Sequence, residues 1–301
     1  MIPKPKIAVI IINYATPSDT IACVESLQRQ TYSNIEIIVI DNNSPDCSCK
    51  DLSNKLKGKC HVIELDRNLG FSGANNLGID YALKHDAVKL LFLNSDTILD
   101  TKLIESLEAV CDPMTVAVPK TYYYNDKNLL WDTGSMVTYW GRLYNRGINE
   151  FDHGQYKEKQ EVPLFTGHCL LIHKKTIEDF GKWEESYFMY VEDTEYSLRM
   201  AQHGVKVVYT PDAILWHKVG QSSGGNKNPK VIYYTVRNRL YLFKENPVPL
   251  RWKFRNICWI ASLVIRCYVF RKKEFALILR AVKDYRSGVR GKVDFGNDRI
   301  K

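Results

Sequence analysis

Several common signatures are missing from this chain of 301 residues. No apolar run reaches the roughly 18–20 residues that a membrane-spanning helix requires. The first fifteen residues, MIPKPKIAVIIINYA, are typical of an apolar strand and lack the three regions of a secretory signal peptide. The eight cysteines include no C-x-x-C pair, so we expect no redox motif and no structural zinc site, and in a chain this long they do not imply a disulfide framework. Together these absences favour a reducing, cytoplasmic setting.

Two phosphate-binding signatures are missing as well. Residues 66–79, DRNLGFSGANNLGI, hold Gly70 and Gly73 at G-x-x-G spacing, whereas a dinucleotide site needs G-x-G-x-x-G and a P-loop needs G-K-[ST]. A Rossmann dehydrogenase is therefore disfavoured. Glycines before a helix still let the backbone approach a phosphate closely, and Arg67 would add a fixed positive charge beside a pyrophosphate.

The chain does contain enough apolar sequence for a core, and its positive charge is uneven. A hydrophobic content of 45% is compatible with one elaborated domain, or with a main domain and a smaller appendage. The net charge is +8, and most of the excess lies in the last fifty residues. Basic charge in that place suits nucleic acid, an anionic membrane surface or an acidic substrate.

The first hundred residues alternate between apolar, β-branched runs and stretches with helical spacing. This order, with strands buried on both faces, predicts an α/β fold with a doubly wound, mostly parallel sheet. We expect strands at residues 6–14, 34–44, 60–68 and 87–96, and helices at residues 16–32 and 70–85.

Polar residues follow each of the four predicted strands at the point where the strand ends. The carboxyl ends of parallel strands meet at one edge of a sheet, which is where open α/β folds bind ligands. Loops are generally polar, but Gly and Ser would serve equally well there, and a carboxylate or carboxamide occurs at all four ends. We therefore expect a shared site, to which the strand ends contribute Asn13-Tyr14, Asp41-Asn42-Asn43, Asp66-Arg67-Asn68 and Asn94-Ser95-Asp96.

The pattern changes in the second part of the chain. Residues 120–165 are rich in aromatics, Gly and Asn and predict hairpins, and a strand followed by a helix is expected at residues 164–181. A loop then leads into a helix that ends at Gly204, a typical C′ glycine, before a strand pair at residues 205–225. The expected organisation is a main domain at 1–228, with halves at about 1–100 and 101–228, and a basic amphipathic helical region at 229–301 with helices at 230–245 and 249–286.

Three positions outside the glycine stretch could carry chemistry. Asp96 closes a buried strand, His217 ends the run AILWH, and Glu192-Asp193 begins a helix whose dipole helps to keep a carboxylate ionised. A divalent cation bridged by substrate phosphates needs only one or two protein ligands, so Asp96 and His217 could form such a site. Taken singly, Asp96 could instead cap a following helix and His217 could be a half-buried structural histidine. Their closeness in space decides between these interpretations.

Five segments of moderate specificity follow one another along the chain. They are IAVIIINYATPSDTIACVESLQRQTYSNIEIIVIDNNSPD, LDRNLGFSGANNLGIDYAL, LLFLNSDTILD, FTGHCLLIHKKTIEDFGKWEESYFMYVEDTEYSLRMAQHG and AILWHKVGQSSG. In this order, over roughly residues 6–225, the sequence resembles the inverting glycosyltransferases of family 2, which have a GT-A fold. Within that family it is similar to the bacterial rhamnosyltransferase-like branch.

The resemblance implies roles for individual positions. Tyr14, Asp41 and Arg67 would line the nucleotide pocket, with Asp41 at the base and Arg67 near the base or the pyrophosphate. Asp193 would be the general base that deprotonates the acceptor hydroxyl, and Glu192 could share that role. The implied set is catalytic residues Asp193 and Glu192, donor-binding residues Tyr14, Asp41, Arg67, Asn68, Asn94, Ser95 and Asp96, metal ligands Asp96 and His217, and Gly167 and His168 in the floor of the acceptor side.

Asn94-Ser95-Asp96 falls at the Asp-x-Asp motif of the family, in which the last Asp holds a cation. Many relatives have Asp where this chain has Asn94, and Asn adds no negative charge, so we expect a weaker metal site that depends on the diphosphate. The implied cation, Mg²⁺ or Mn²⁺, would offset the charge that grows on the leaving diphosphate. A carboxylate base opposite the leaving group gives one in-line displacement and needs no second carboxylate nucleophile.

Residues 246–292 mix Trp, Ile, Leu and Val with Arg and Lys. A basic, Trp-bearing amphipathic helix can lie in a membrane interface, although the same sequence could form a packed helical hairpin with solvated basic edges. We favour peripheral contact with the inner face of the cell membrane, because bacterial members of the resembled family often act on lipid-linked saccharides. Nucleic acid is disfavoured as a partner because no recognised binding motif accompanies the charge.

The leading hypothesis is a metal-dependent inverting glycosyltransferase of bacterial cell-surface polysaccharide synthesis. The resembled branch implies dTDP-L-rhamnose as donor, with a UDP-hexose as the alternative, and a saccharide or lipid-linked saccharide as acceptor. A nucleotidyltransferase would normally carry a Gly-rich, basic loop after the first strand, where this chain has NYATPSD. A non-catalytic saccharide- or membrane-binding scaffold is disfavoured because Asp96 and Asp193 are both present.

Overall fold

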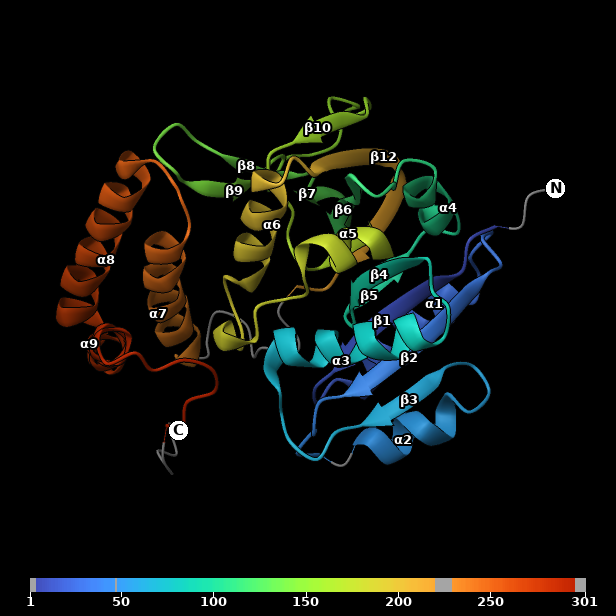
Figure 1. Ribbon diagram of the computed structural model, residues 1–301, viewed down its shortest axis with the longest axis horizontal. Coiled ribbons are helices and arrows are strands. Elements are labelled where there is room, and N and C mark those ends of the chain that lie inside the picture. The colour runs from blue at the N-terminus through green and yellow to red at the C-terminus, as the bar shows by residue number, and fades with distance from the viewer. Residues whose placement is uncertain (1–3, 47, 220–228, 296–301) are drawn as a thin grey trace.

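The computed structural model describes residues 4–46, 48–219 and 229–295 of the chain. In this part of the chain, ten strands form a central sheet in the order β10-β12-β6-β11-β4-β1-β2-β3, with β5 paired to β12 and β7 to β6 (Figure 1). A separate hairpin is formed by β8 and β9. The sheet is mixed, with a parallel half that begins the chain and a second half added beside β4.

The parallel half consists of β1 (Ile7–Asn13), β2 (Ile35–Asp41), β3 (His61–Glu64) and β4 (Lys89–Asn94). β1 lies between β2 and β4, and its register pairs Asn13 with Asp41, so the polar strand ends are aligned. β1 and β4 are almost wholly buried, because their apolar side chains fill both faces of the sheet. The predicted doubly wound arrangement is confirmed.

Helices cover both faces of this half. α1 (Pro17–Leu27), α2 (Ser48–Lys55) and α4 (Leu103–Glu108) pack on one face, and α3 (Gly70–Lys84) packs on the other. The helices α2 and α4 were not expected from the sequence, since each has only about two turns and too few residues to show a helical period.

The second half of the sheet reverses direction at β11 (Cys169–His173), which is antiparallel to β4. β6 (Thr115–Tyr123) and β12 (Lys206–His217) then run parallel to each other. The strand pair expected from residue 205 is wrong, because residues 206–217 form one long strand with a register shift between Thr210 and Ile214. The remaining elements are β5 (Thr97–Leu99), β7 (Asp126–Asp132), β8 (Ser135–Val137), β9 (Leu143–Asn145), β10 (Gln160–Val162), α5 (Lys174–Phe180), the 3₁₀ turn Glu185–Tyr187 and α6 (Glu192–Gln202).

Three helices form the C-terminal part of the described chain: α7 (Lys230–Glu245), α8 (Leu250–Phe270) and α9 (Lys272–Arg286). The helix predicted at residues 230–245 is confirmed, whereas residues 249–286 form two helices that meet at Arg271. These helices pack together on one side of the sheet domain and contact the segment before α6 (Figure 1). The expected boundary at residue 228 lies outside the described residues. None of the described helices combines the length and apolar character needed to cross a membrane.

Candidate active site

A cavity of about 550 Å³ opens at the carboxyl edge of the sheet. Its wall comes from the strand ends of the parallel half, from the second half of the sheet and from the segment that enters α6. The residues that line the cavity include Tyr14, Asn42, Asn68, Phe71, Asn94, Ser95, Asp96, Trp131, Thr166, Gly167, His168, Met189, Tyr190, Val191, Glu192, Asp193 and His217.

Asp96 and His217 meet in this cavity because two strands pair. Asp96 follows β4 and precedes β5, and β5 runs antiparallel to β12 with Thr97 opposite His217. Nε2 of His217 lies 3.0 Å from Oδ1 of Asp96, and the two residues are only 4% and 3% exposed. Since a strand follows Asp96, the alternative that it caps a helix is excluded.

Nε2 of His217 and the carboxylate of Asp96 are hydrogen-bonded, and their spacing also fits two adjacent ligands of a divalent cation. Adjacent ligands at about 2.1 Å in an octahedral shell stand about 3.0 Å apart, and this is the distance between the two atoms that face each other. Nδ1 of His217 is buried and has no hydrogen-bond partner among the described residues. Within the described ranges, no cluster of three or more His, Cys, Asp or Glu side chains could hold a metal ion. A cation held by Asp96 and His217 would therefore need further oxygen ligands from its substrate.

Trp131 of β7 packs against two histidines of the site. Its ring meets the rings of His168 and His217 edge to face, with centroids 4.6 Å apart in both cases. The two imidazoles are nearly parallel, with an interplanar angle of 12° and centroids 5.6 Å apart. This indole restrains the orientation of His217, and thereby the direction in which Nε2 points toward Asp96.

Burial makes His168 a neutral imidazole, and its hydrogen bonds fix which ring nitrogen carries the proton. Oγ1 of Thr166 donates its one proton to the carboxylate of Asp132 at 2.9 Å, so Nδ1 of His168 must donate to Thr166 at 2.6 Å. Nε2 of His168 then accepts from Oγ1 of Thr121 at 2.8 Å. Burial and the neighbouring His217 also hold the pKa of His168 well below its usual value. His168 therefore lines the cavity without adding charge.

Glu192 and Asp193 begin α6 and both line the cavity, but their environments differ. Burial, reinforced by the charge of Asp193, raises the pKa of Glu192 to about 8. Oε2 of Glu192 is buried with no hydrogen-bond partner among the described residues. Burial also raises the pKa of Asp193, but the backbone N–H groups of Gly167 and Thr194 donate to its carboxylate at 3.2 and 2.6 Å and oppose that rise. Asp193 is thus the member of the pair that ionises at lower pH.

The predicted donor-binding residues divide into two groups. Tyr14, Asn68, Asn94, Ser95 and Asp96 line the cavity. Asp41 and Arg67 do not line it: Arg67 is exposed, and Asp41 is 1% exposed. The carboxylate of Asp41 accepts from Nδ2 of Asn13 at 2.6 Å and from the backbone N–H and Oγ of Ser44. Roles for Asp41 and Arg67 at a nucleotide base stay predictions.

Asn42 and Trp131 line the cavity as well, although neither had an individual role assigned from the sequence. Asn42 donates from Nδ2 to the carbonyl oxygen of Gly70 at 3.0 Å and accepts from the N–H of Leu69 at 2.8 Å, so it anchors the start of α3 at the cavity. Its place at a strand end was the signal that put it in the expected shared site. Trp131 lies in the aromatic-rich region and gave no comparable signal, because its importance comes from contacts with residues far along the chain.

The family model of Glycosyl transferase family 2 matches residues 8–181, more than half of the chain. The chain belongs to this family. This glycosyltransferase is 27% identical over 288 residues to the dTDP-rhamnosyl transferase RfbF of Shigella flexneri, and the match covers 90% of each chain. It is 24% identical over 282 residues to the low-salt glycan biosynthesis hexosyltransferase Agl10 of Haloferax volcanii, with 89% of this chain and 87% of the relative covered. The predicted family and enzyme class are confirmed.

Solved structures agree on the fold of this glycosyltransferase. GalNAc-T7, solved with UDP, GalNAc and Mn²⁺, superposes with a TM-score of 0.69 at 15% identity. The superposition covers 96% of this chain and 59% of the GalNAc-T7 chain. The mannosyltransferase PcManGT of Pyrobaculum calidifontis, solved with GDP-Man and Mn²⁺, gives a TM-score of 0.56 at 13% identity. The predicted GT-A fold with C-terminal helices is confirmed.

Proposed function

We propose that this glycosyltransferase moves a sugar, with inversion, from a nucleoside diphosphate sugar to a hydroxyl of a saccharide or lipid-linked saccharide in bacterial cell-surface polysaccharide synthesis. One observation carries the proposal: a single cavity is lined both by Asp193, an acid poised to ionise, and by the buried Asp96–His217 pair. The first can accept a proton from an acceptor, and the second can hold the cation of a diphosphate.

Asp193 acts as the base. A sugar hydroxyl is a poor nucleophile, and a positioned carboxylate that accepts its proton contributes roughly 10²–10⁴-fold to the rate. The proton passes from the acceptor hydroxyl to Asp193 while the hydroxyl oxygen attacks the anomeric carbon. The bond from that carbon to the diphosphate breaks on the opposite side, so one displacement inverts the configuration. Glu192, with a pKa of about 8, is a neutral acid at pH 7 and can donate a hydrogen bond to the acceptor.

Asp96 and His217 would hold Mg²⁺ or Mn²⁺, which offsets the negative charge that grows on the departing diphosphate. GalNAc-T7 was solved with UDP and Mn²⁺, and PcManGT with GDP-Man and Mn²⁺, which supports the same cation class here. Asn94 and Ser95 precede Asp96 in the cavity wall and complete the donor side with Tyr14. Because Asn94 is uncharged, the diphosphate oxygens carry a larger share of the binding of the cation.

The donor is dTDP-L-rhamnose, with a UDP-hexose as the alternative. Similarity to a dTDP-rhamnosyl transferase over 90% of the chain supports the first, and the hexosyltransferase Agl10 supports the second. Both donors present a diphosphate to the same cation, so the chemistry at Asp193 and Asp96 is common to them. Tyr14 and Asn68 lie on the wall where the nucleoside and sugar would be distinguished.

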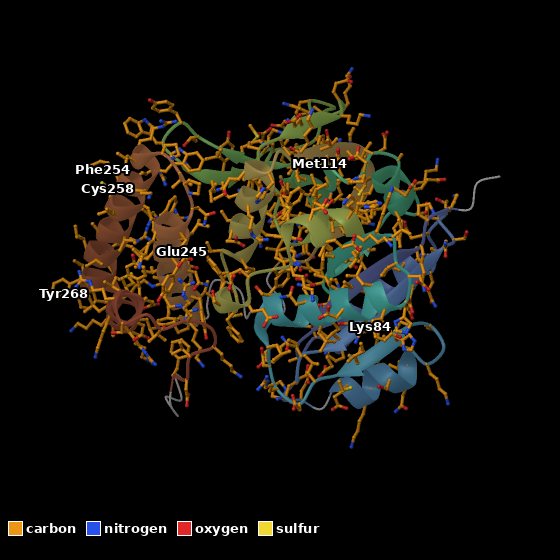
Figure 2. All side chains as sticks on the ribbon, viewed as in Figure 1. Lys84, Met114, Glu245, Phe254, Cys258 and Tyr268 are labelled. Atoms are coloured by element: carbon orange, nitrogen blue, oxygen red, sulfur yellow. The ribbon has the colours of Figure 1, made fainter. Side chains whose placement is uncertain are left out.

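Helix α8 supports peripheral contact with an anionic membrane. Apolar side chains recur at helical spacing along one side of it and are 58–81% exposed, and Figure 2 shows Phe254 and Tyr268 on its outer side. The exposed stripe consists of Leu250, Phe254, Ile257, Ile265, Tyr268 and Val269.

Basic side chains accompany this stripe. Arg266 is exposed on α8, and Arg271, Lys272 and Lys273 are exposed where α8 meets α9. An apolar stripe flanked by lysine and arginine is the pattern of a helix that lies in the headgroup region of an anionic bilayer. A membrane-bound enzyme would meet a lipid-linked acceptor at that surface.

The test of the proposed function is a screen of nucleotide sugars. Purified protein is incubated with dTDP-L-rhamnose, UDP-glucose, UDP-galactose and GDP-mannose, each with Mn²⁺, with Mg²⁺ and with EDTA, and release of the nucleoside diphosphate is measured. We expect release from one donor class, dependent on the metal. Release from none of them, together with no thermal shift by any nucleotide, would contradict the proposal.

A further inference from the structure

The segment that presents Glu192 and Asp193 has an uncommon backbone. Residues 187–191, called the base loop below, join the 3₁₀ turn to α6. Three of its five residues, none of them glycine, have positive φ: Phe188 at 65°, Tyr190 at 63° and Val191 at 75°. For a β-branched residue such as Val191 the left-handed conformation is a genuine outlier.

The base loop also contains a strained turn. At Phe188, φ is 65° and ψ is −61°, and the N–H of Met189 donates to the carbonyl oxygen of Tyr187 at 2.8 Å. These values define a γ-turn with its central residue at positive φ, which is the rarer and strained form. Strained backbone persists only where the surroundings hold it. The contacts of the base loop therefore identify what fixes Asp193 in place.

Asn238, in the middle of α7, makes most of these contacts. Its Nδ2 lies 2.9 Å from the carbonyl oxygen of Tyr187, 2.9 Å from that of Met189 and 2.8 Å from that of Tyr190. The residue is 1% exposed, so no water is available to replace these bonds. The two N–H groups of one side-chain amide are thus shared among three carbonyl oxygens of a strained five-residue segment.

Arg237 extends the same contact to the segment that follows α9. It is 0% exposed; its Nε donates to Oδ1 of Asn238 at 3.0 Å, and Nη1 donates to the carbonyl oxygen of Gly291 at 2.8 Å. Gly291 in turn donates its N–H to the carbonyl oxygen of Ser186 at 2.7 Å, directly before the base loop. Arg237 holds the Oδ1 end of the Asn238 amide, so that Nδ2 points at the loop.

The other side of the base loop is tied to the donor half. The N–H of Phe71, in the first turn of α3, donates to the carbonyl oxygen of Phe188 at 2.7 Å. A Cβ added to Gly70 would lie 2.2 Å from that oxygen, so a glycine is required for this approach. The loop is therefore held between the helix that borders the donor side and the helix that carries Asn238.

We infer that Asn238, oriented by Arg237, is a positioning residue for catalysis: the C-terminal helices hold the strained base loop and so fix the carboxylate of Asp193 for proton transfer. The inference rests on the proposed role of Asp193 as base. It gives α7 a part in the reaction beyond covering the sheet domain.

The test compares two buried asparagines in the C-terminal helices. Asn238→Ala removes the contacts to the base loop, and Asn256→Ala is the matched control, since Asn256 is 2% exposed and accepts from Nε of Arg239 without contacting the loop. Amide hydrogen exchange of residues 184–194 and the thermal midpoint are measured for both, then kcat and KM with the donor that the nucleotide-sugar screen selects. Asn238→Leu keeps the side-chain volume and replaces Asn238→Ala in these measurements if the alanine variant does not fold.

We expect Asn238→Ala or Asn238→Leu to speed exchange in residues 184–194 and to lower kcat about 10²-fold with KM for the donor nearly unchanged, because small misplacements of a base cost that much. Asn256→Ala should change neither. If an Asn238 variant shows the same kcat and the same amide exchange in residues 184–194 as Asn256→Ala, the inference is wrong. Asp193→Asn tests the role of Asp193 separately from the role of Asn238. If Asp193→Asn keeps turnover, the proposed base is wrong. If it loses turnover, the proposed base is supported whatever the result for Asn238.

Discussion

Nε2 of His217 lies 3.0 Å from Oδ1 of Asp96, although the two residues are 121 positions apart in the sequence. The antiparallel pairing of β5 with β12 produces this closeness, since it sets Thr97 opposite His217. Neither residue was distinctive alone, and together they form a buried carboxylate–imidazole pair at the cavity. The pairing excludes two unrelated structural residues, and a cation at this pair stays a prediction.

Replacing Trp131 should weaken cation binding through His217. The indole packs edge to face on both histidines of the site, so Trp131→Ala frees the His217 ring to rotate. Removing a residue that orients a metal ligand typically lowers metal affinity about 10–100-fold. Trp131→Phe keeps an aromatic ring, so its metal affinity should fall by less. Titration of Mn²⁺ in the presence of UDP or dTDP measures the affinity of each variant for the cation. Trp140→Ala, at an exposed tryptophan, is the control, and equal affinities for all variants would contradict the prediction.

Asn94→Asp should tighten the cation site. Asn94 lines the cavity two residues before Asp96, and no hydrogen bond holds its side chain among the described residues. A second carboxylate near the cation adds attraction that an amide cannot supply. We expect the Mn²⁺ concentration for half-maximal activity to fall, and the need for bound diphosphate to decrease. An unchanged or weaker response to Mn²⁺ would place Asn94 away from the cation.

Much of the fold was predictable because its signals are local. β1 and β4 contain continuous apolar runs, as does β2 after Glu36, and such runs are buried on both faces in a parallel sheet. The break at Arg271 and the single long β12 were missed, because helix and strand continuity there depends on packing between segments rather than on sequence period.

The site was predictable only in part, for a similar reason. Asn94, Ser95 and Asp96 could be located because polar residues ending a buried strand are visible in the sequence. The role of Asn238 could not, since it arises where a helix far along the chain meets the base loop. The neutral state of Glu192 also depends on burial, which residue spacing does not reveal.

Asp193→Asn should abolish sugar transfer while leaving nucleotide binding nearly intact. The substitution keeps the size of the side chain but removes the proton acceptor, so the rate should fall by roughly 10²–10⁴-fold. Calorimetric titration with the nucleoside diphosphate and Mn²⁺ checks that the donor side is undisturbed. Glu192→Gln is the comparison: it keeps a neutral hydrogen-bonding group, so its loss of activity at pH 7 should be much smaller. Equal losses in both variants would count against a distinct base.

Glu192 should make the folded protein less stable as pH rises. In the folded state it keeps its proton up to about pH 8, whereas in the unfolded chain it ionises near 4.5. Between these values the folded state binds more protons, so the free energy of unfolding falls with pH, by at most about 1.4 kcal/mol per unit from this group. Denaturant unfolding between pH 5 and 8 should show a flatter dependence for Glu192→Gln. Glu178→Gln, at an exposed position, should keep the wild-type slope.

Substitutions on the exposed stripe of α8 should reduce membrane binding. Phe254 and Tyr268 are 64% and 66% exposed on its outer side (Figure 2), and burying each in a bilayer is worth about 1.5–3 kcal/mol. Phe254→Glu with Tyr268→Glu should therefore lower co-sedimentation with phosphatidylglycerol vesicles by at least about tenfold. Point substitutions are preferable to truncation, because Gly291 bonds to Ser186 beside the base loop.

Two controls make this membrane test decisive. Met114→Glu places the same charge on an exposed apolar residue of the sheet domain, away from α8 (Figure 2), and should leave vesicle binding unchanged. Binding should also weaken at high salt and on uncharged phosphatidylcholine, since the basic residues at the α8–α9 junction contribute by electrostatic attraction. If wild-type protein ignores the vesicles but forms a dimer in light scattering that Phe254→Glu with Tyr268→Glu disrupts, the stripe is an interface between two copies of the chain, and the proposed membrane contact is wrong.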